Sequence, residues 1–598
     1  MRLRTGLMLL SPEIVLFHTI FKRQVQPPCD NIETCDTECP GGITLKLRTL
    51  SIALLLSVAG VHASIAAPAP APNSVQNPGS NFLPGLPGYG SAQGSIIVVY
   101  GANLGPSSLV QATTLPLQTS LSNTSITVTV GATTVNLLMV YTVASQLAAV
   151  LPSNTPVGNG TLTVTFNGQN GSTPIVVVAS AVGILTANET GTGPAVATHV
   201  NNQLITSTNA ANEGEEIQIY ATGIDGLPGG ASDASAPGAV TFSTTNVVVY
   251  VGGVQLNANA LKYWGRNPSD PGLDQINIIL PANVTGCQVS LVIQTGTGGN
   301  IYVSNTVTLA IAASGSTCSD PNGINVSQLT PAFNANGTAS LGSLNLMQSS
   351  YTISGQSFTS ANASASFLKY TQLEFSQSTT GFLPSIGSCI IVIQNSLITG
   401  TPNPPTGLDA GAQIGVMPPT GSAFNMAVNA ALGKGYYGTT FGTLTQITPG
   451  AYHFTGPGGA DVGAFLASLT VPPNLTWTNQ AAVTTSPIVR ANGVTINWTG
   501  GDPSSYAYII GISYNNNPNN ASATLGAEFI CIAPISAGTF FVPPAVTLSL
   551  PGSGGAAASP FGIIALGTFS TPQKFTATGL DYAYASSTSF SGGSVVWQ

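Results

Sequence analysis

The sequence predicts an all-β protein: two β-sandwiches in tandem, followed by a further β-sandwich-like C-terminal region. Three observations carry this prediction. The composition is rich in strand-forming and turn-forming residues, one series of strand-like phrases occurs twice, and apolar and polar residues alternate within those phrases. Alternation with period two is typical of strands that have one buried face and one wet face.

The composition combines few charges with many apolar residues. Charged side chains are 5% of the 598 residues, against roughly 25% in typical soluble proteins, while 43% are apolar and there are 68 Gly and 42 Pro. Disorder requires low hydrophobicity, which this chain lacks. After residue 63 no stretch offers the roughly 20 consecutive apolar residues of a membrane-spanning helix. The composition therefore favours a β-rich protein whose polar surface consists of Ser, Thr, Asn and Gln.

The charge balance argues against nucleic acid as a partner. Half of the twelve basic residues lie in the first fifty positions, and the chain after residue 63 carries a net charge of about −9. A nucleic-acid-binding surface needs clustered Lys and Arg to neutralise phosphates. We expect no such surface here.

The segment LKLRTLSIALLLSVAGVHAS (45–64) has the three parts of a secretory signal: a basic start, an apolar run and a small-residue cleavage site before Ser64. The apolar run is too short to span a bilayer, and the APAPAP that follows would end a buried helix. We therefore expect residues 1–63 to be leader and signal peptide and 64–90 a Pro-rich linker. The protein should be secreted or associated with the cell envelope.

Residues 1–44 fit poorly in front of such a signal, and two interpretations stay open. The start codon is misassigned, or Cys29, Cys35 and Cys39 form a metal or redox site. Their spacing matches no standard zinc pattern, which favours the first interpretation.

An oxidising compartment makes the remaining four cysteines candidates for disulfides. Four cysteines allow three connectivities. We favour Cys287–Cys318, because a two-strand excursion separates them, and Cys389–Cys531 by exclusion; four buried free thiols are the alternative.

The repeat is visible in SIIVVYGANLGP (95–106) and EEIQIYATGIDGLP (215–228). The strand-like phrases after the two copies follow the same order: 125–131, 137–143, 146–152 and 160–166 in the first, and 247–253, 260–265, 275–281 and 289–295 in the second. Tyr100 aligns with Tyr220 and Gln146 with Gln275, and GRNPSDPG (265–272) is the expected insertion. Units of about 120 residues can each close a core, so we predict sandwiches over 91–182 and 183–316.

These phrases resemble the IPT/TIG group of immunoglobulin-like domains. The resemblance rests on GSIIVVYGANLGP, ITVTVG and QLAAVLP in the first copy, and on YATGI (220–224) in the second. The arrangement is closer still to a tandem β module of uncharacterised secreted acidobacterial proteins. The resemblance covers roughly residues 74–312 and implies immunoglobulin-like β-sandwiches. Such domains occur in adhesins, in surface receptors and as accessory modules of carbohydrate-active enzymes, so it implies no single activity.

The C-terminal half is expected to be β-rich without a clear repeat. We predict a β-rich region with long loops over 317–450, containing one short helix within 365–378, and a β-sandwich-like region over 451–598. Its expected strands lie at 464–472, 493–501, 506–514, 527–534 and 538–551.

The sequence shows no catalytic or metal-binding constellation. His199 and His453 are the only histidines after residue 63, and no GxSxG, HExxH or EF-hand loop occurs. Glu213, Glu215 and Glu216 suggest either an edge-protecting charge cluster or, less strongly, a calcium site. We predict no catalytic residue, no metal site and no cofactor, and expect the chain not to be an enzyme.

Paired aromatics offer the one hint of a ligand. Tyr263-Trp264 precedes the inserted loop and Tyr436-Tyr437 follows a Gly-rich run. Exposed Tyr and Trp rings stack on sugars, although core packing is the competing role. The expected function is non-catalytic adhesion or binding, to polysaccharide or another surface protein. A matrix or filament subunit, and a carbohydrate-active enzyme with its site in 319–598, are the alternatives.

Overall fold

The computed structural model describes residues 67–598 except for 228–230, 298–299, 321–325, 354–355, 378–382, 396–404, 440–443, 518–519 and 554–560. Strands dominate the described residues, as the all-β prediction requires. No helix among them is long and apolar enough to cross a membrane. The predicted signal peptide and the cluster of Cys29, Cys35 and Cys39 lie outside the described residues.

The first unit is a sandwich of two sheets. One sheet has the order β1-β3-β9-β8-β4 and the other β2-β11-β10-β6-β5, with β7 paired to β6. The strands are β1 (Ala69–Gln76), β2 (Ser91–Ala92), β3 (Ile96–Ala102), β4 (Val110–Gln111), β5 (Ser120–Leu121), β6 (Thr124–Val130), β7 (Thr133–Asn136), β8 (Leu138–Val143), β9 (Gln146–Val150), β10 (Gly158–Phe166) and β11 (Gln169–Val178).

The second unit repeats this topology. Its sheets have the orders β12-β15-β20-β19-β16, with β13 paired to β15, and β14-β23-β21-β17-β18, with β22 paired to β21. The strands are β12 (Gly183–Ile184), β13 (Ala197–His199), β14 (Ala211–Asn212), β15 (Glu216–Thr222), β16 (Val240–Thr241), β17 (Val247–Val251), β18 (Val254–Gln255), β19 (Leu261–Arg266), β20 (Asp274–Ile279), β21 (Gly286–Thr297), β22 (Asn300–Val303) and β23 (Val307–Ala312).

The predicted repeat is confirmed down to residue pairs. Tyr100 lies opposite Gln146 on β3 and β9, and Tyr220 lies opposite Gln275 on β15 and β20. In both units the second sheet begins with a short parallel pair, β2 with β11 and β14 with β23. The core follows from alternation: on β6, Ile126, Val128 and Val130 face inward. Equivalent sequence phrases therefore occupy equivalent strands.

Part of the predicted linker is a strand. Residues 69–76 form β1, which pairs antiparallel with β3 at the edge of the first sheet. Pro70 is tolerated there because an edge strand has one side on which no ladder N–H is needed.

Most of the predicted insertion (265–272) forms the loop of residues 267–273, because Gly265 and Arg266 still belong to β19. This loop joins the two sandwiches. The hydroxyl of Thr222 accepts a hydrogen bond from the Ile96 N–H (3.0 Å) and donates one to the Gly272 carbonyl (2.7 Å). A Cβ on Gly272, which has a φ of +76°, would collide with the side chains of Ile96 and Val150 in the first sandwich. Only glycine fits this backbone conformation and approach.

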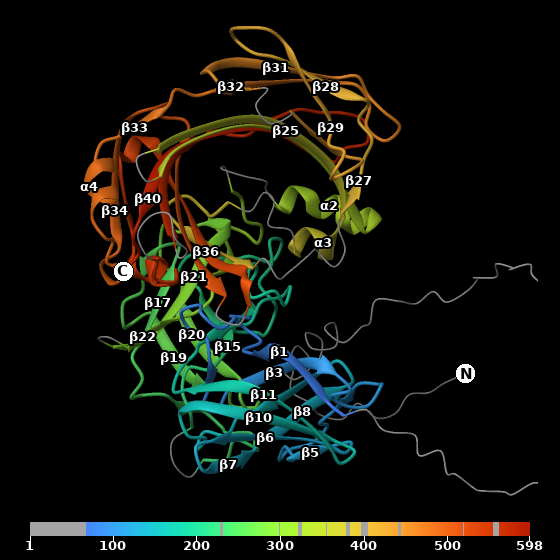
Figure 1. Cartoon of the computed structure of the whole chain (residues 1–598), viewed down its shortest axis with the longest axis vertical. Coiled ribbons are helices and arrows are strands. Elements are labelled where there is room, and N and C mark those ends of the chain that lie inside the picture. Colours follow the sequence, from blue (N-terminus) through green and yellow to red (C-terminus); the bar gives the residue numbers. More distant parts are fainter. Residues whose placement is uncertain are drawn as a thin grey trace, which may run out of the picture.

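Residues beyond 325 form one long curved sheet of order β26-β36-β35-β38-β40-β24-β25-β30-β29-β28-β31-β32, seen as an arch in Figure 1. Its strands are β24 (Thr338–Ile353), β25 (Gln356–Thr371), β26 (Cys389–Asn395), β28 (Gln413–Met417), β29 (Phe424–Val428), β30 (Tyr436–Gly438), β31 (Gly450–Gly456), β32 (Phe465–Val471), β35 (Tyr506–Asn517), β36 (Asn520–Pro534), β38 (Phe561–Phe569) and β40 (Tyr582–Val595), while β27 (Thr406–Gly407) and β39 (Gln573–Lys574) pair to its side.

A separate three-stranded sheet and short helices complete this part. The sheet is β33 (Leu475–Trp477), β34 (Val494–Gly500) and β37 (Thr539–Val542). The helices are α2 (Val326–Asn336), α3 (Gln372–Gln377), α4 (Gln480–Thr485) and α5 (Pro544–Thr547), with 3-10 turns η1 (Arg490–Asn492) and η2 (Ile535–Ala537).

The two faces of the long sheet are covered differently. The convex face carries two cores, one under β28, β31 and β32 and the other under β33, β34 and β37. The concave face packs against α2 and α3 at one end of the arch, through Leu329, Phe333 and Phe375 (Figure 1). The arch thus has a covered outside and a partly open inside.

The C-terminal half departs from the sequence expectation in four places. The helix predicted within 365–378 is confined to α3, because residues up to Thr371 extend β25. The expected loops of 401–450 contain β27 to β30, and the expected strand at 538–551 splits into β37 and α5. The sheet also crosses residue 450, since β24 pairs in parallel with β40.

Candidate functional site

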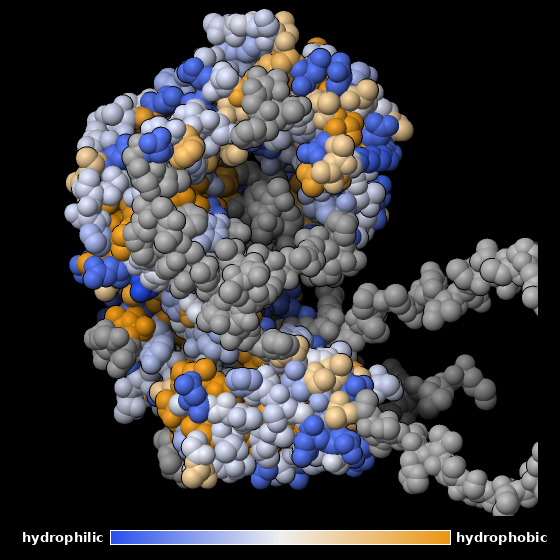
Figure 2. All heavy atoms as spheres, in the orientation of Figure 1, coloured by the Kyte–Doolittle hydropathy of each residue, from blue (hydrophilic) through white to orange (hydrophobic). Residues whose placement is uncertain are grey.

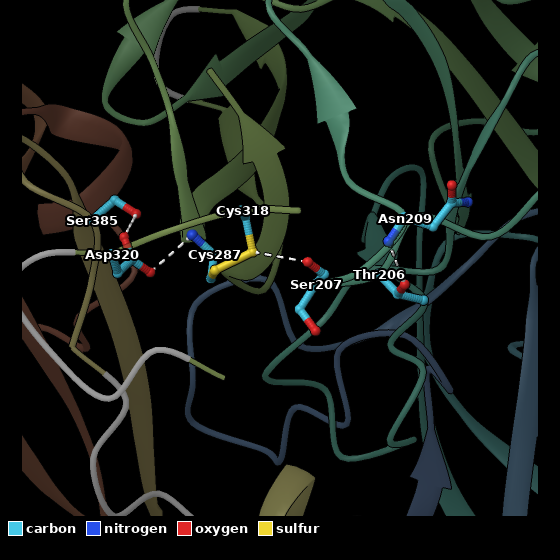
Figure 3. Close-up of a disulfide and its surroundings, with 7 residues drawn as sticks. All are labelled: Thr206, Ser207, Asn209, Cys287, Cys318, Asp320 and Ser385. Carbon is cyan, nitrogen blue, oxygen red and sulfur yellow. Dashed lines mark hydrogen bonds between the residues drawn. A yellow bond between two sulfur atoms is a disulfide. The ribbon is translucent and has the colours of Figure 1, made fainter. Parts of the chain in front are cut away.

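Both expected disulfides are present. Cys287 is bonded to Cys318, and the two residues belong to β21 and to the segment that leaves the second sandwich. The Cys318 sulfur lies 3.4 Å from the Ser207 carbonyl oxygen (Figure 3). The carboxylate of Asp320 accepts hydrogen bonds from the Cys287 N–H (2.8 Å) and the Ser385 hydroxyl (3.1 Å) (Figure 3). This junction ties the second sandwich to the C-terminal sheet.

The second disulfide lies inside the C-terminal sheet. Cys389 on β26 and Cys531 on β36 are directly opposite each other, with their Cα atoms 4.0 Å apart. Both are buried in the core between this sheet and the β33-β34-β37 sheet. All four cysteines are buried, and we assign both disulfides a structural role.

The histidines and the acidic cluster take part in local contacts. Nδ1 of His199 contacts the Glu215 carboxylate, whose other oxygen accepts a hydrogen bond from the Asn212 N–H (2.9 Å). His453 lies exposed on β31, with Nδ1 3.0 Å from the Ser468 hydroxyl. Among the described residues no group of three or more His, Cys, Asp or Glu side chains gathers in a geometry that could hold a metal ion.

Asp461 lies in the connection between β31 and β32, and Asp502 in the connection between β34 and β35. Asp461 accepts a hydrogen bond from the Asp409 N–H and pairs with Lys434 (Oδ2 to Nζ, 2.6 Å). Backbone hydrogen bonding and the Lys434 ammonium hold the pKa of Asp461 below its ordinary value. Asp502 accepts bonds from Ser504 in the same manner. Both carboxylates order the backbone around them.

The aromatic pair Tyr436-Tyr437 mainly makes contacts within the fold. Tyr437 is buried on β30, where its hydroxyl accepts a hydrogen bond from the Ala410 N–H (3.0 Å) and donates one to the Gly411 carbonyl (2.9 Å). Its ring packs edge-on against Phe367. Tyr436 faces the other side of the strand and packs against the small core beside α2. This geometry leaves Tyr437 no face for a sugar.

The two residues of the pair Tyr263-Trp264 have different roles. The Tyr263 hydroxyl donates to backbone carbonyls, among them that of Arg266 at 2.5 Å. Trp264 is half-buried, packs against the core of the second sandwich, and donates its indole N–H to the Phe242 carbonyl (3.0 Å). Its ring also lines a pocket. Trp264 is the predicted aromatic that the structure places beside an open space.

This pocket lies between the outer strands of the two sheets of the second sandwich and has a volume of about 470 Å³. β17, β18 and β19 and the segment before β17 surround it. Trp264, Leu256 and Leu261 supply apolar surface, and uncharged polar groups supply the rest, namely Ser243, Thr244, Thr245, Asn246, Gln255 and Asn257. Ligand pockets typically combine an apolar lining with a few fixed polar groups. A site without formal charge suits a neutral, hydroxyl-bearing ligand.

The polar groups of the pocket are held by local hydrogen bonds. The Asn257 side chain accepts bonds from the Asn259 and Ala260 N–H groups, and the Asn246 amide donates to the Gly296 carbonyl (3.1 Å). Thr245 donates its hydroxyl to the Asp225 carboxylate. These contacts fix the rim of the pocket before any ligand arrives, which lowers the ordering cost of binding.

Sequence reasoning missed a second feature, the concave face of the arch. Strand register places Tyr351, Tyr508, Tyr514 and Phe590 on this one face, although they come from three strands that lie far apart in the sequence, β24, β35 and β40. Figure 2 shows the molecule hollowed beneath the arch, with hydrophobic side chains along the wall of the hollow. No local signal marks these residues, because only the pairing of distant strands brings them together.

Comparisons with known proteins give little further information. No protein-family description matches the chain, and no curated protein matches it. One similar solved structure holds the N-terminal eight immunoglobulin domains of Down syndrome cell adhesion molecule (DSCAM) isoform 1.30.30, at 9% identity and a TM-score of 0.12. The match covers 84% of this chain and 52% of that one, so this chain spans about half the length of that structure. A likeness this weak says nothing about function.

Proposed function

We propose that this chain is a secreted or cell-surface, non-catalytic protein for adhesion or binding, whose ligand is polysaccharide or another surface protein. We further propose that its first two sandwiches are immunoglobulin-like domains of the IPT/TIG type. The observation that carries the binding role is the uncharged pocket beside Trp264. Two disulfides support an oxidising compartment, where such bonds persist.

The architecture supports a role in presentation. The inserted loop fastens the first sandwich to the second, and Asp320 fastens the second to the C-terminal sheet. Interfaces between domains of one chain are often mobile unless they are well packed. Here buried side-chain hydrogen bonds cross both junctions, which suits a protein that holds binding surfaces at fixed positions.

The test is retention of residues 64–598 on insoluble polysaccharides and on envelopes of the producing organism. We expect saturable retention on at least one of these materials. Retention on none of them, with the protein folded by circular dichroism, would sink the binding role. Polymers seen by electron microscopy in that case would favour the filament alternative, and hydrolysis of a glycan would favour the enzymatic one.

A variant pair tests the pocket itself. Trp264→Ala removes the ring from the pocket, whereas Trp264→Phe keeps an aromatic face and loses the bond to the Phe242 carbonyl. If a sugar stacks there, the alanine variant should bind about tenfold more weakly, or about 1.4 kcal/mol. The phenylalanine variant should stay within a few-fold of wild type. Equal binding by all three proteins would move the site elsewhere.

A further inference from the structure

The concave face of the arch brings aromatic residues from distant strands into one surface. Tyr351 lies on β24, Phe590 on β40, and Tyr508 and Tyr514 on β35. The rings of Tyr351 and Phe590 are 5.5 Å apart between centroids. All four residues are half-buried, and Met347 beside them has 38% of its surface exposed. An aromatic surface of this kind remains reachable from solvent.

Glu528 on β36 lies on the same face as the tyrosines, because it pairs with Ile512, two residues before Tyr514 on β35. Burial, and then the Glu528 carboxylate, raise the pKa of Tyr351 to about 12. Burial and the same carboxylate also raise the pKa values of Tyr508 and Tyr514. The phenols of these three tyrosines therefore stay protonated donors at neutral pH.

A row of hydroxyl and amide groups runs beside the aromatic residues. The Ser586 hydroxyl donates to Asn345 (2.7 Å), the Asn345 amide reaches Ser343 (3.5 Å), and Ser343 is 2.8 Å from Ser366. These four side chains share the concave face, because their strands pair in register at these positions. The row continues the surface from the aromatic stripe toward α2.

The chemistry of this face matches an uncharged sugar polymer. Pyranose rings present C–H faces to aromatic rings and hydroxyls at their edges. In the polar row Ser343 and Ser586 are buried, and the half-buried Asn345 and Ser366 are the members that a sugar hydroxyl could reach. Charge points the same way. Glu528 lies among the tyrosines, whereas the cation described on this face, Lys574, sits at the α2 end over the Tyr582 ring. A polyanion would meet a like charge where the aromatic surface is largest.

We infer that the concave face of the C-terminal sheet is a binding surface for an uncharged polysaccharide chain, with Tyr351, Tyr508, Tyr514 and Phe590 stacking on sugar rings and Glu528 accepting hydrogen bonds from their hydroxyls. This inference rests on the proposed binding function and gives it a ligand class. It places a second binding surface on the arch, in addition to the pocket beside Trp264.

The experiment measures binding of residues 64–598 to cellulose, chitin and curdlan as neutral probes and to alginate as an anionic one. The test variants are Tyr351→Ser and Tyr514→Ser. Leu466→Ser and Phe541→Ser are matched controls, because these apolar residues are exposed (78% and 51%) and lie on β32 and β37, away from the concave face. We expect at least one neutral polysaccharide to bind, about tenfold weaker binding by each test variant, and unchanged binding by both controls.

Two conservative variants keep the test valid if a serine variant fails to fold. Tyr351→Phe should keep most of the binding, because the ring remains. Glu528→Gln should leave neutral binding within a few-fold and increase retention on alginate, since it removes the repelling charge. Thermal unfolding of every variant checks the fold.

Three results would overturn the inference. They are neutral binding that the serine variants leave unchanged, a preference for alginate in the wild type, and retention on envelopes but on no polysaccharide. Retention on envelopes alone would still support the proposed binding function, but with a protein as the partner. Retention on nothing would sink the proposed function together with the inference.

Discussion

Arg266 and Asp274 are buried charges in a chain that has few charges. Their side chains are fully buried and 2.6 Å apart (Nη1 to Oδ1), and Arg266 also donates to the Asp225 carbonyl (3.0 Å). The Asp274 carboxylate accepts a further bond from the Ile224 N–H (2.8 Å). Removing one partner of a buried pair costs about 3–5 kcal/mol, because the other charge stays behind uncompensated. The pair therefore specifies the loop that joins the sandwiches.

Asp274 should make the free energy of unfolding fall as the pH rises. Burial raises its pKa to about 6, against the lowering effect of Arg266, so the native state holds this proton more tightly than the unfolded state. The contribution of the group is therefore largest in acid and falls as the pH rises through 6, by roughly 3 kcal/mol in total. We expect Asp274→Asn to abolish this slope in unfolding free energy between pH 4.5 and 7.

The control for this prediction is Asp502→Asn. Hydrogen bonds from Ser504 keep the pKa of Asp502 below its ordinary value, so it does not titrate in this interval. That variant should retain the wild-type slope in urea titrations at each pH. A wild-type slope in Asp274→Asn as well would mean that Asp274 stays ionised throughout.

At the scale of strands, the two disulfides differ in the length of chain that they close. Cys389–Cys531 spans 142 residues and Cys287–Cys318 spans 31. A longer loop loses more entropy in the unfolded chain when it is closed. We expect the Cys389→Ala/Cys531→Ala variant to lose about 5 kcal/mol of unfolding free energy, and the Cys287→Ala/Cys318→Ala variant about 4 kcal/mol.

Urea unfolding of both double variants, each beside the wild type, measures this ranking. Far-UV circular dichroism should stay close to wild type in both, since the strands are also held by their ladders. A larger loss for the shorter loop would show that local strain or residual structure, and not loop length, governs the effect.

The strands of the tandem sandwiches were predictable, and those of the arch were predictable only in part. In SITVTVG (125–131) polar and apolar residues alternate, which identifies a strand, and the repeat aligns Tyr100 with Tyr220. By contrast β24 and β40 are separated by more than 200 residues, and no local sequence pattern predicts that they pair. Local alternation identifies a strand but does not choose its neighbour.

The site shows the same limit. Trp264 was recognisable because a Tyr-Trp pair precedes an insertion, and the structure places its ring at a pocket. Tyr436-Tyr437 was equally recognisable, but Tyr437 is buried. Tyr351 and Tyr514 had no neighbouring signal, because their common surface exists only after four strands have paired.

For the molecule as a whole, β40 holds the C-terminal half together. It lies between β38 and β24, pairs antiparallel with the first and parallel with the second, and contributes to all three cores of that half. We expect a chain ending at residue 580, without β40, to lose the cooperative unfolding transition of the C-terminal half. The two sandwiches of residues 67–316 should keep theirs.

Differential scanning calorimetry and limited proteolysis check this prediction. A chain with Ser594→Ala, which changes β40 without removing it, serves as the control and should unfold as the wild type does. Persistence of the full C-terminal transition in the shortened chain would show that β38 and β24 can close the sheet without their shared neighbour.

The parallel pairing of β24 with β40 also has a consequence for biosynthesis. The ribosome releases β24 and β25 long before it reaches residue 582, so the nascent hairpin carries an unpaired edge while most of its sheet is still untranslated. Such an edge is a template for pairing with other chains. The low charge of the surrounding sequence offers little protection. When many ribosomes translate the same messenger RNA, neighbouring nascent chains should therefore aggregate through this hairpin. A chaperone that binds the hairpin should suppress the aggregation.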